Sequence, residues 1–384
     1  MMISCRRNAI VVETCTEVGS AQRPQVPDGD SYEGRLGLAQ VTGCGVSTPE
    51  PDDNSSRATN RKKRGALKKT AGALAVLLGL LVSACSGSNP SAPTPPAPQP
   101  QPITVTVHLT ETGSGQPLAG VAGTLGSASG VTNGDGGVQF QLAPGAAQRL
   151  SLTGASIVPR SVMLAVNGSR EVSVDAIPTA GFDLNFYRQL VRDGYEGSLQ
   201  PLRRWTEAPR IYLKTIDEAG AAIDGRSLDT TERAIVETIG LWTGGRLAVA
   251  GVERGTDNRV GTAGWITVRW PARVSDRGFC GQSDIAVSGG AIDLFYKQGG
   301  NCACPGLSVV RPQTVRHELG HAMGFFHTDD RAGIMSNPAT AGCDKLPSAR
   351  ERAAAAIAYA RPVGNSDPDT DPASVVTLAP MRAY

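Results

Sequence analysis

Residues 317–327 read HELGHAMGFFH, and this short stretch holds three of the four histidines in a chain of 384 residues. An α-helix advances by about 100° per residue, so His317 and His321 lie on one face, one turn apart, and both imidazoles can reach a single ion. Glu318 lies about 100° round the helix from His317, where it can act on a water molecule without binding the ion itself. The spacing therefore predicts a metal site on a helix.

A third ligand can reach the same ion only if this helix ends and the chain turns back. Gly324 permits such a turn because glycine alone adopts φ > 0 without a steric cost. His327 then completes a set of three nitrogens, and three neutral imidazoles with a fourth position open to water suit Zn²⁺ in a catalytic role. We therefore predict one catalytic zinc ion held by His317, His321 and His327. Glu318 is the predicted general base, and we make no prediction about a structural calcium ion.

The pattern HExxHxxGxxH, followed by GIMSNP at residues 333–338, resembles the metzincin zinc metalloproteases. The resemblance is greatest to the matrixin-like branch and covers about thirty residues from His317 onward. In that family a methionine lies beneath the zinc-bound histidines, which implies that Met335 packs under the site and is not a ligand. Two departures are present. Residues 328–330 (TDD) match no single subfamily, and no tyrosine follows Met335 where some branches carry a further ligand, so a five-coordinate site is not expected.

The resemblance implies a zinc-dependent endopeptidase that hydrolyses peptide bonds of extracytoplasmic proteins. Zinc would polarise the scissile carbonyl, and Glu318 would take a proton from water and pass it to the leaving amine. Two other functions stay open: a zinc-binding but inactive surface adhesin, and a zinc hydrolase of a non-peptide amide. The presence of Glu318 argues against the inactive form. No cysteine-containing propeptide switch of the matrixin kind is visible, so the sequence predicts no mechanism of latency.

An export signal precedes the rest of the chain. Basic residues between positions 61 and 69 come before the apolar stretch Ala71–Leu81, which is too short to span a bilayer and is followed by VSAC at residues 82–85. This order is typical of a bacterial lipoprotein signal peptide, here residues 60–84, after which Cys85 becomes the lipidated first residue. A plain secretory signal or a short buried helix is the alternative. We therefore predict an exported protein, either anchored to a membrane through Cys85 and facing the periplasm or the cell surface, or secreted.

Three further segments are predicted to lie outside folded domains. Residues 1–59 are polar and precede the signal, which indicates a misassigned start codon or an unusually long, disordered extension. Residues 85–102 are rich in Ser, Pro, Ala and Gln, a composition that cannot bury a core and behaves as a semi-rigid spacer. Residues 363–384 are predicted to be a disordered tail.

Short segments that alternate apolar and polar residues predict a small antiparallel β-sandwich over residues 103–178. The segments are Ile103–Leu109, Val138–Leu142, Arg149–Leu152, Val162–Val166 and Val172–Ile177. Turn residues at 116–121 and 132–136 resemble those of carboxypeptidase-regulatory or transthyretin-like modules. His108 falls on the polar face of the first strand, and we expect it to be a solvated surface residue and not a ligand.

Residues 180–362 are predicted to form an α+β catalytic domain with a twisted mixed sheet, the metal-binding helix, the methionine turn and a C-terminal helix. Strands are expected at 210–215, 246–252 and 266–270. The run Ala291–Tyr296 is predicted to be the edge strand that pairs with an extended substrate.

Two helix starts are also marked in this domain. A capping-box-like DTTE at residues 229–232 predicts a helix that ends at Gly244-Gly245, and its apolar face comprises Ile235, Val236, Ile239 and Trp242. A capping box, SARE, at residues 348–351 opens an alanine-rich helix that extends to about Ala360.

Cysteine usage agrees with export. Four thiols lie beyond Cys85, namely Cys280, Cys302, Cys304 and Cys343. An even number in an oxidising compartment predicts two disulfides, and a Cys302–Cys304 pair is the least favoured because its loop is so tight. A metal site at Cys302-Ala303-Cys304 is a weaker alternative, since CxC lacks CxxC spacing.

The charge balance bears on partners. The net charge of +2 provides no basic patch, so nucleic acid is not an expected partner. A protein or peptide substrate and the membrane, through the lipid anchor, are the expected partners, and the oligomeric state is not predicted.

Overall fold

The computed structural model describes residues 100–272, 278–295, 302–304, 306–307, 309–337 and 342–383. The predictions for residues 1–59, for the signal at 60–84, for Cys85 and for most of the spacer lie outside these residues. Among the helices of the described part, none is both long enough and apolar enough to cross a membrane.

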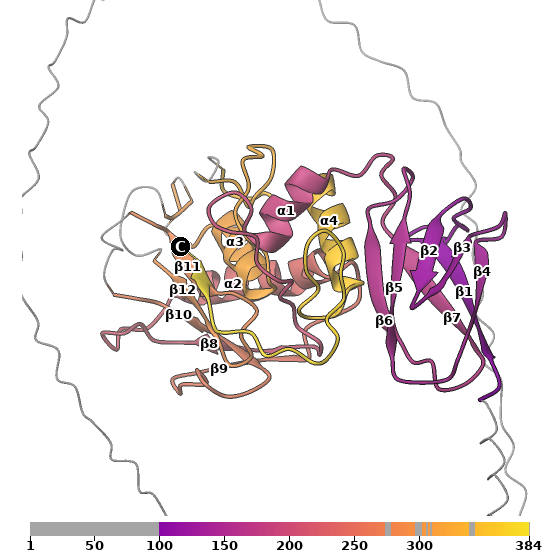
Figure 1. Cartoon of the computed structure of the whole chain (residues 1–384). Helices are drawn as coiled ribbons and strands as arrows, with labels where there is room; N and C mark the ends of the chain where they lie inside the picture. The colour runs from indigo at the N-terminus through magenta and orange to yellow at the C-terminus, as the bar shows by residue number, and fades with distance from the viewer. Residues whose placement is uncertain are drawn as a thin grey trace, which may run out of the picture. The chain divides into compact units, whose positions relative to one another are not determined.

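Two sheets enclose an apolar core in the N-terminal part of the described chain (Figure 1). One has the order β4-β1-β7 and the other β3-β2-β5-β6. The strands are β1 (Ile103–Glu111), β2 (Ala122–Leu125), β3 (Ala128–Val131), β4 (Gly137–Leu142), β5 (Gln148–Thr153), β6 (Arg160–Leu164) and β7 (Arg170–Ala176). Alternate residues of β1, Val105, Val107 and Leu109, are fully buried, as a period of two requires.

Two details of this module differ from the prediction. The sheets are not wholly antiparallel, because β1 and β7 run parallel. The four-residue strands β2 and β3 were not predicted, since they are too short to show a period of two. His108 is on the exposed side of β1, where its Nε2 lies 3.7 Å from a carboxylate oxygen of Glu171, in agreement with a surface role.

A six-stranded mixed sheet and four helices surround a second apolar core. The sheet order is β13-β11-β12-β10-β8-β9, with β11 antiparallel to both neighbours and the other pairs parallel. The strands are β8 (Arg210–Lys214), β9 (Gly251–Gly255), β10 (Trp265–Arg269), β11 (Gly281–Asp284), β12 (Ala291–Leu294) and β13 (Arg382–Ala383). The helices are α1 (Leu184–Arg192), α2 (Gly225–Trp242), α3 (Pro312–Ala322) and α4 (Ala349–Tyr359). The mixed sheet agrees with the predicted architecture.

The capping residues in the sequence predicted the start of α4 correctly and the start of α2 less accurately. The capping box of α4 is present, with both reciprocal hydrogen bonds between Ser348 and Glu351. Helix α2, however, begins five residues earlier than predicted, because Asp224 accepts a hydrogen bond from the Ser227 N–H at 2.8 Å and acts as the N-cap. Val236 was placed on its apolar face but is 49% exposed, which narrows that face to the other three residues.

Two strands of this sheet differ from the prediction in position. The predicted edge strand at Ala291–Tyr296 is an inner strand, β12, because β11 pairs with its outer side. The strand expected at 246–252 is found at Gly251–Gly255. Pairing order depends on contacts between distant segments, which the local pattern of a strand does not encode.

The tail at 363–384 was predicted to be disordered and is instead ordered as far as residue 383. Asn365 and Asp369 are buried, and the Asn365 amide donates to Asp369 at 2.9 Å. Arg361, fully buried, donates to Asp369 at 2.8 Å, and β13 adds to the sheet beside β11. The prediction rested on the position of these residues at the chain terminus. Their charged groups belong to a buried ion-pair network, in which the charges satisfy one another.

Candidate metal centre

Helix α3 and the turn after it bring the three histidines together. His317 and His321 are buried on α3, which ends at Ala322. Gly324 follows with φ of +112°, and a Cβ on it would overlap the carbonyl oxygen of Arg203. The expected glycine turn is therefore present, and it returns the chain so that His327 faces the other two rings.

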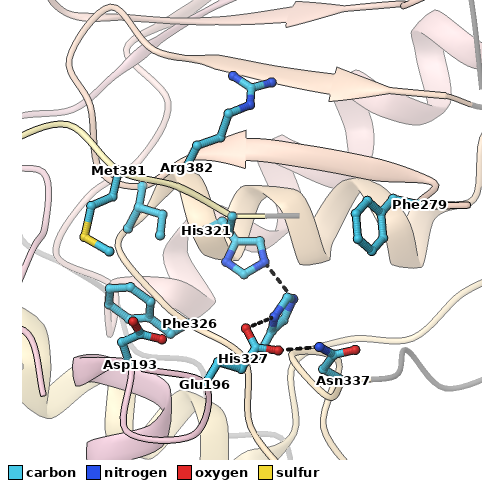
Figure 2. Close-up of a pocket in the computed structure, with 11 residues that line it drawn as sticks. Asp193, Glu196, Phe279, His321, Phe326, His327, Asn337, Met381 and Arg382 are labelled. Carbon is cyan, nitrogen blue, oxygen red and sulfur yellow. Dashed lines mark hydrogen bonds and ion pairs between the residues drawn. The ribbon is translucent and has the colours of Figure 1, made fainter. Parts of the chain in front are cut away.

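The three Nε2 atoms converge on one point. Figure 2 shows two of the three rings, those of His321 and His327. His317 and His321 are 3.1 Å apart, and each lies 3.2 Å from His327. A tetrahedral zinc ion with Zn–N bonds of about 2.0–2.1 Å requires nitrogens roughly 3.3 Å apart. The ligand set therefore fits a zinc ion.

Each ring is oriented by an acceptor at its other nitrogen. Nδ1 lies 2.6 Å from the Ile334 carbonyl oxygen in His317, 2.7 Å from the Phe325 oxygen in His321 and 2.9 Å from Glu196 Oε2 in His327. Because these oxygens only accept, the Nδ1 atoms carry the protons and the Nε2 lone pairs face one another. Three lone pairs at this separation repel unless a cation lies between them.

Burial keeps the rings on α3 neutral. Loss of hydration, followed by the proximity of His327, lowers the pKa of His317 to about 4. The same two causes hold the pKa of His321 well below its ordinary value. Neutral imidazole is the form that binds a metal ion.

Glu196 is a site residue that the sequence did not reveal. It lies in the loop after α1, 131 positions before His327, and it also accepts a hydrogen bond from the Asn337 side chain. Burial works against its charge, but the hydrogen bonds from His327 and Asn337 outweigh it and lower the pKa of Glu196. No periodic or spacing signal links residues so far apart.

Replacing Glu196 by alanine is expected to lower zinc affinity about 10- to 100-fold, because the His327 ring loses the carboxylate that orients it. Glu196→Gln is the matched control, since it keeps an acceptor oxygen and should lose less. Titration with a competing chelator measures both. Equal affinity in Glu196→Ala and the unchanged chain would show that the carboxylate does not orient the ligand.

Glu318 is buried, at 3% exposure, and follows the first ligand on α3. Its Oε2 has no hydrogen-bond partner among the described residues. Burial raises the pKa of Glu318 well above its ordinary value, and Arg382 partly offsets this. A Cβ on Gly281 would overlap the Glu318 carboxylate, so strand β11 passes directly beside it. A buried carboxylate oxygen without a partner among the described residues, next to three metal ligands, is available for a water or substrate proton.

Met335 is fully buried beneath the ligand helix. A Cβ on Gly320, which stands between the two histidines of α3, would lie 2.6 Å from Met335 Sδ and 3.0 Å from Trp242. The Met335 N–H donates to Glu351 at 2.8 Å, so the capping-box glutamate of α4 also holds this turn. Met335 is therefore a packing neighbour of the ligand helix.

Gly320→Ala should destabilise the protein by about 1–2 kcal/mol, although alanine ordinarily favours a helix, because the added methyl overpacks against Met335 and Trp242. Gly240→Ala on α2 is the matched control, since a Cβ there meets nothing within 4 Å. That change should stabilise by up to about 1 kcal/mol. Urea unfolding measures both, and a shift of the same sign in the two variants would contradict the packing account.

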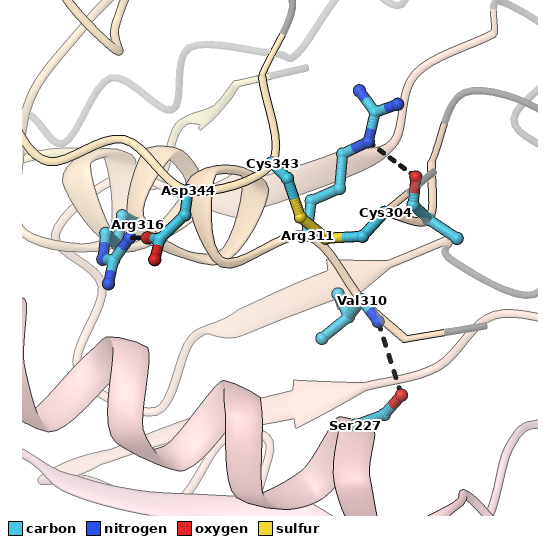
Figure 3. The surroundings of a disulfide bond; sticks show 8 residues. Ser227, Cys304, Val310, Arg311, Arg316, Cys343 and Asp344 are labelled. Carbon is cyan, nitrogen blue, oxygen red and sulfur yellow. Dashed lines mark hydrogen bonds and ion pairs between the residues drawn. A yellow bond between two sulfur atoms is a disulfide. The ribbon is translucent and has the colours of Figure 1, made fainter. Parts of the chain in front are cut away.

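The predicted pair of disulfides is present: Cys280–Cys302 and Cys304–Cys343. The second joins the segment before α3 to the loop after the methionine turn (Figure 3). Asp344, next in that loop, pairs with Arg316 on α3. These two links connect α3 and the segment before it to the loop after the methionine turn. Disulfides indicate an extracytoplasmic location.

A pocket of about 260 Å³ opens over the centre. His321 and His327 line it together with Phe279 of the loop before β11, with Met381, and with Arg382 and Ala383 of β13 (Figure 2). The histidines are thus accessible from a cavity large enough for part of a ligand.

No protein-family model and no curated protein matches the sequence. Among solved structures, metalloproteinase-II from Bacteroides fragilis matches 68% of this chain and 92% of its own, with 10% identity and a TM-score of 0.28. A type II cohesin–X-dockerin complex from Acetivibrio cellulolyticus matches 19% of this chain at 21% identity, with a TM-score of 0.16. This chain spans 56% of that second chain. Both TM-scores are low, so we base the function on the geometry of the site.

Proposed function

We propose that this protein is a zinc-dependent endopeptidase of the matrixin-like branch that cleaves proteins outside the cytoplasm. The observation that carries the proposal is the convergence of three unprotonated Nε2 atoms, from His317, His321 and His327, beside the buried carboxylate of Glu318. The HExxHxxGxxH pattern and the burial of Met335 under the ligand helix support a metzincin-type site, and the choice of the matrixin-like branch rests on the sequence resemblance that begins at His317.

The chain's own residues would divide the work as follows. The ion would be held by the Nε2 atoms of His317, His321 and His327. Glu196 would keep the His327 ring in the orientation that points its Nε2 at the ion. A bound zinc ion supplies a Lewis acid that polarises the scissile carbonyl and lowers the pKa of water at the open position to about 7. Glu318 would accept the proton of the attacking water and deliver it to the leaving amine.

Zinc analysis and a casein assay on the full mature chain test the proposal. We expect one zinc ion per chain, loss of hydrolysis on chelation and recovery when zinc is restored. His321→Ala should lose both metal and activity, while His108→Ala, on the exposed side of β1, should keep both. Zinc at full occupancy without casein hydrolysis would contradict an endopeptidase, and turnover of an acylated sugar by the same sample would identify a non-peptide amidase.

We also propose that the mature chain begins at a lipidated Cys85. The basic segment, the short apolar stretch and VSAC at residues 82–85 support this anchor, and the two disulfides agree with export. Mass spectrometry of the native N-terminus tests it: an unmodified residue upstream of Cys85 would remove the anchor from the proposal.

A further inference from the structure

The C-terminal strand β13 occupies a sheet edge beside the metal centre. It pairs antiparallel with β11, Ala383 opposite Ser283 and Arg382 opposite Asp284, and the Ile285 N–H donates to the Met381 carbonyl at 2.9 Å. Without β13, β11 would be the outermost strand on this side. A free edge exposes unpaired N–H and C=O groups, which an extended peptide can bind as an added strand.

This edge belongs to the same cavity as the histidines. Met381, Arg382 and Ala383 line the pocket together with His321 and His327 (Figure 2). Strand β11 also contacts the catalytic carboxylate, since a Cβ on Gly281 would overlap Glu318. A peptide on the β11 edge would therefore run past both the ligands and the base, and it cannot bind there while β13 is in place.

The strand is fixed by a cation between two carboxylates. Arg382 Nη1 lies 2.9 Å from Asp284 Oδ1, and Nη2 donates to Asp293 Oδ2. Asp293 is 3% exposed and also binds Arg269, at 2.7 and 2.9 Å. With Arg382 removed, two carboxylates would face one guanidinium, and the vacant position would favour another cationic side chain. Figure 2 shows Arg382 directed away from His321, so this position selects a side chain without touching the metal ligands.

Few contacts hold the segment that leads to β13. Val375 is 99% exposed, and most residues from 373 to 380 are exposed as well. The main anchor in this stretch is the Arg203 guanidinium, which donates to the Ala379 carbonyl at 2.7 Å. A two-residue strand on a lightly held segment opens at a small free-energy cost. A substrate that forms more strand pairs could therefore displace it.

We propose that the β11 edge binds an extended peptide with a basic side chain between Asp284 and Asp293, and that the chain's own C-terminal strand fills this site in the free protein. The proposal rests on the proposed peptidase function and adds to it a substrate preference and a means of latency. The tether keeps β13 at an effective concentration on the order of millimolar, so it competes with a free peptide.

Binding of a labelled peptide is the first test, because it requires no turnover. The peptide has the sequence of residues 378–384, LAPMRAY, and is offered to the full mature chain and to a chain that ends at Thr377. Anisotropy should show binding to the shortened chain at least tenfold tighter than to the full chain. The same peptide with Arg382→Glu should bind at least tenfold more weakly. Asp284→Asn in the shortened chain should also weaken binding, while Asp257→Asn, at an exposed carboxylate elsewhere, should not.

Full-length Arg382→Glu covers the case in which the shortened chain does not fold. It keeps every backbone group, and its thermal midpoint verifies folding. It should bind the labelled peptide like the shortened chain does. Equal peptide binding by the full chain and by either open variant, or no binding by a folded open variant, would overturn the proposal.

Hydrolysis separates this proposal from the peptidase function. Removal of β13 from the β11 edge should raise kcat/KM on casein peptides at least tenfold, mainly by lowering KM. Peptides that carry Arg or Lys should be preferred over those with Glu. Unchanged kcat/KM in an active, folded open variant would overturn the latency. If the open variants bind the peptide more tightly than the full chain but no variant hydrolyses casein, peptide binding at the β11 edge would be supported and only the endopeptidase function would be overturned.

Discussion

Glu318→Gln is expected to lower casein hydrolysis by a factor of about 10² to 10⁴, the range lost when a positioned general base is removed. Glutamine keeps the volume of the side chain, so the close approach of Gly281 of β11 is not disturbed. The amide cannot accept the proton of the attacking water at neutral pH. Zinc content should stay at the level of the unchanged chain, because Glu318 is not among the three converging ligands.

Steady-state kinetics and elemental analysis on the same samples measure both quantities. Glu207→Gln is the matched control, because Glu207 is exposed in the loop before β8, and it should retain full activity. If Glu318→Gln keeps near-normal turnover, the base is a different residue, and the buried Glu318 carboxylate would then need another role. If zinc is lost together with activity, Glu318 acts on the metal-binding geometry and not as a base.

The metal centre was predictable because its residues are local. The ligands and the base lie within eleven residues, and a helix followed by a glycine turn fixes their geometry whatever the rest of the fold does. Capping chemistry at Ser348 is equally local, so the start of α4 was predicted correctly. The presence of two disulfides followed from the number of cysteines, and the tight Cys302–Cys304 loop disfavoured one of the three pairings. The sequence did not decide between the other two pairings.

Features that depend on distant contacts were missed. Glu196 reaches His327 across 131 positions, and nothing in its own neighbourhood marks it as part of the site. The position of β12 inside the sheet depends on β11 pairing with it, and β13 consists of two residues whose pairing partner lies about a hundred positions earlier. Residues 363–384 were predicted to be disordered because they form the chain terminus, and this position cannot show that Asp369 and Arg361 neutralise each other in a buried network.

Gly324→Ala is expected to lower the free energy of unfolding by about 3 kcal/mol or more and to reduce zinc binding, although residue 324 touches no metal ligand through a side chain. A φ of +112° is strained for any residue with a Cβ, at about 1–3 kcal/mol. The added methyl would also overlap the Arg203 carbonyl, a backbone atom that cannot rotate away. Relief of that overlap would move the turn that carries His327. The His327 Nε2 would then no longer lie 3.2 Å from the Nε2 atoms of the other two histidines.

Gly245→Ala is the control that separates the strain of a positive φ from the overlap with a neighbouring backbone atom. Gly245 also has a positive φ, of +75°, but a Cβ there meets nothing within 4 Å, so the loss should be about 1 kcal/mol and zinc affinity should not change. Urea unfolding of the metal-free chains gives the stability difference, and chelator competition gives the zinc affinity. The site argument fails if Gly324→Ala binds zinc as tightly as Gly245→Ala does. In that case contacts beyond the turn, such as the hydrogen bond between His327 and Glu196, would already fix the third ligand, and the glycine would be needed only for the backbone turn.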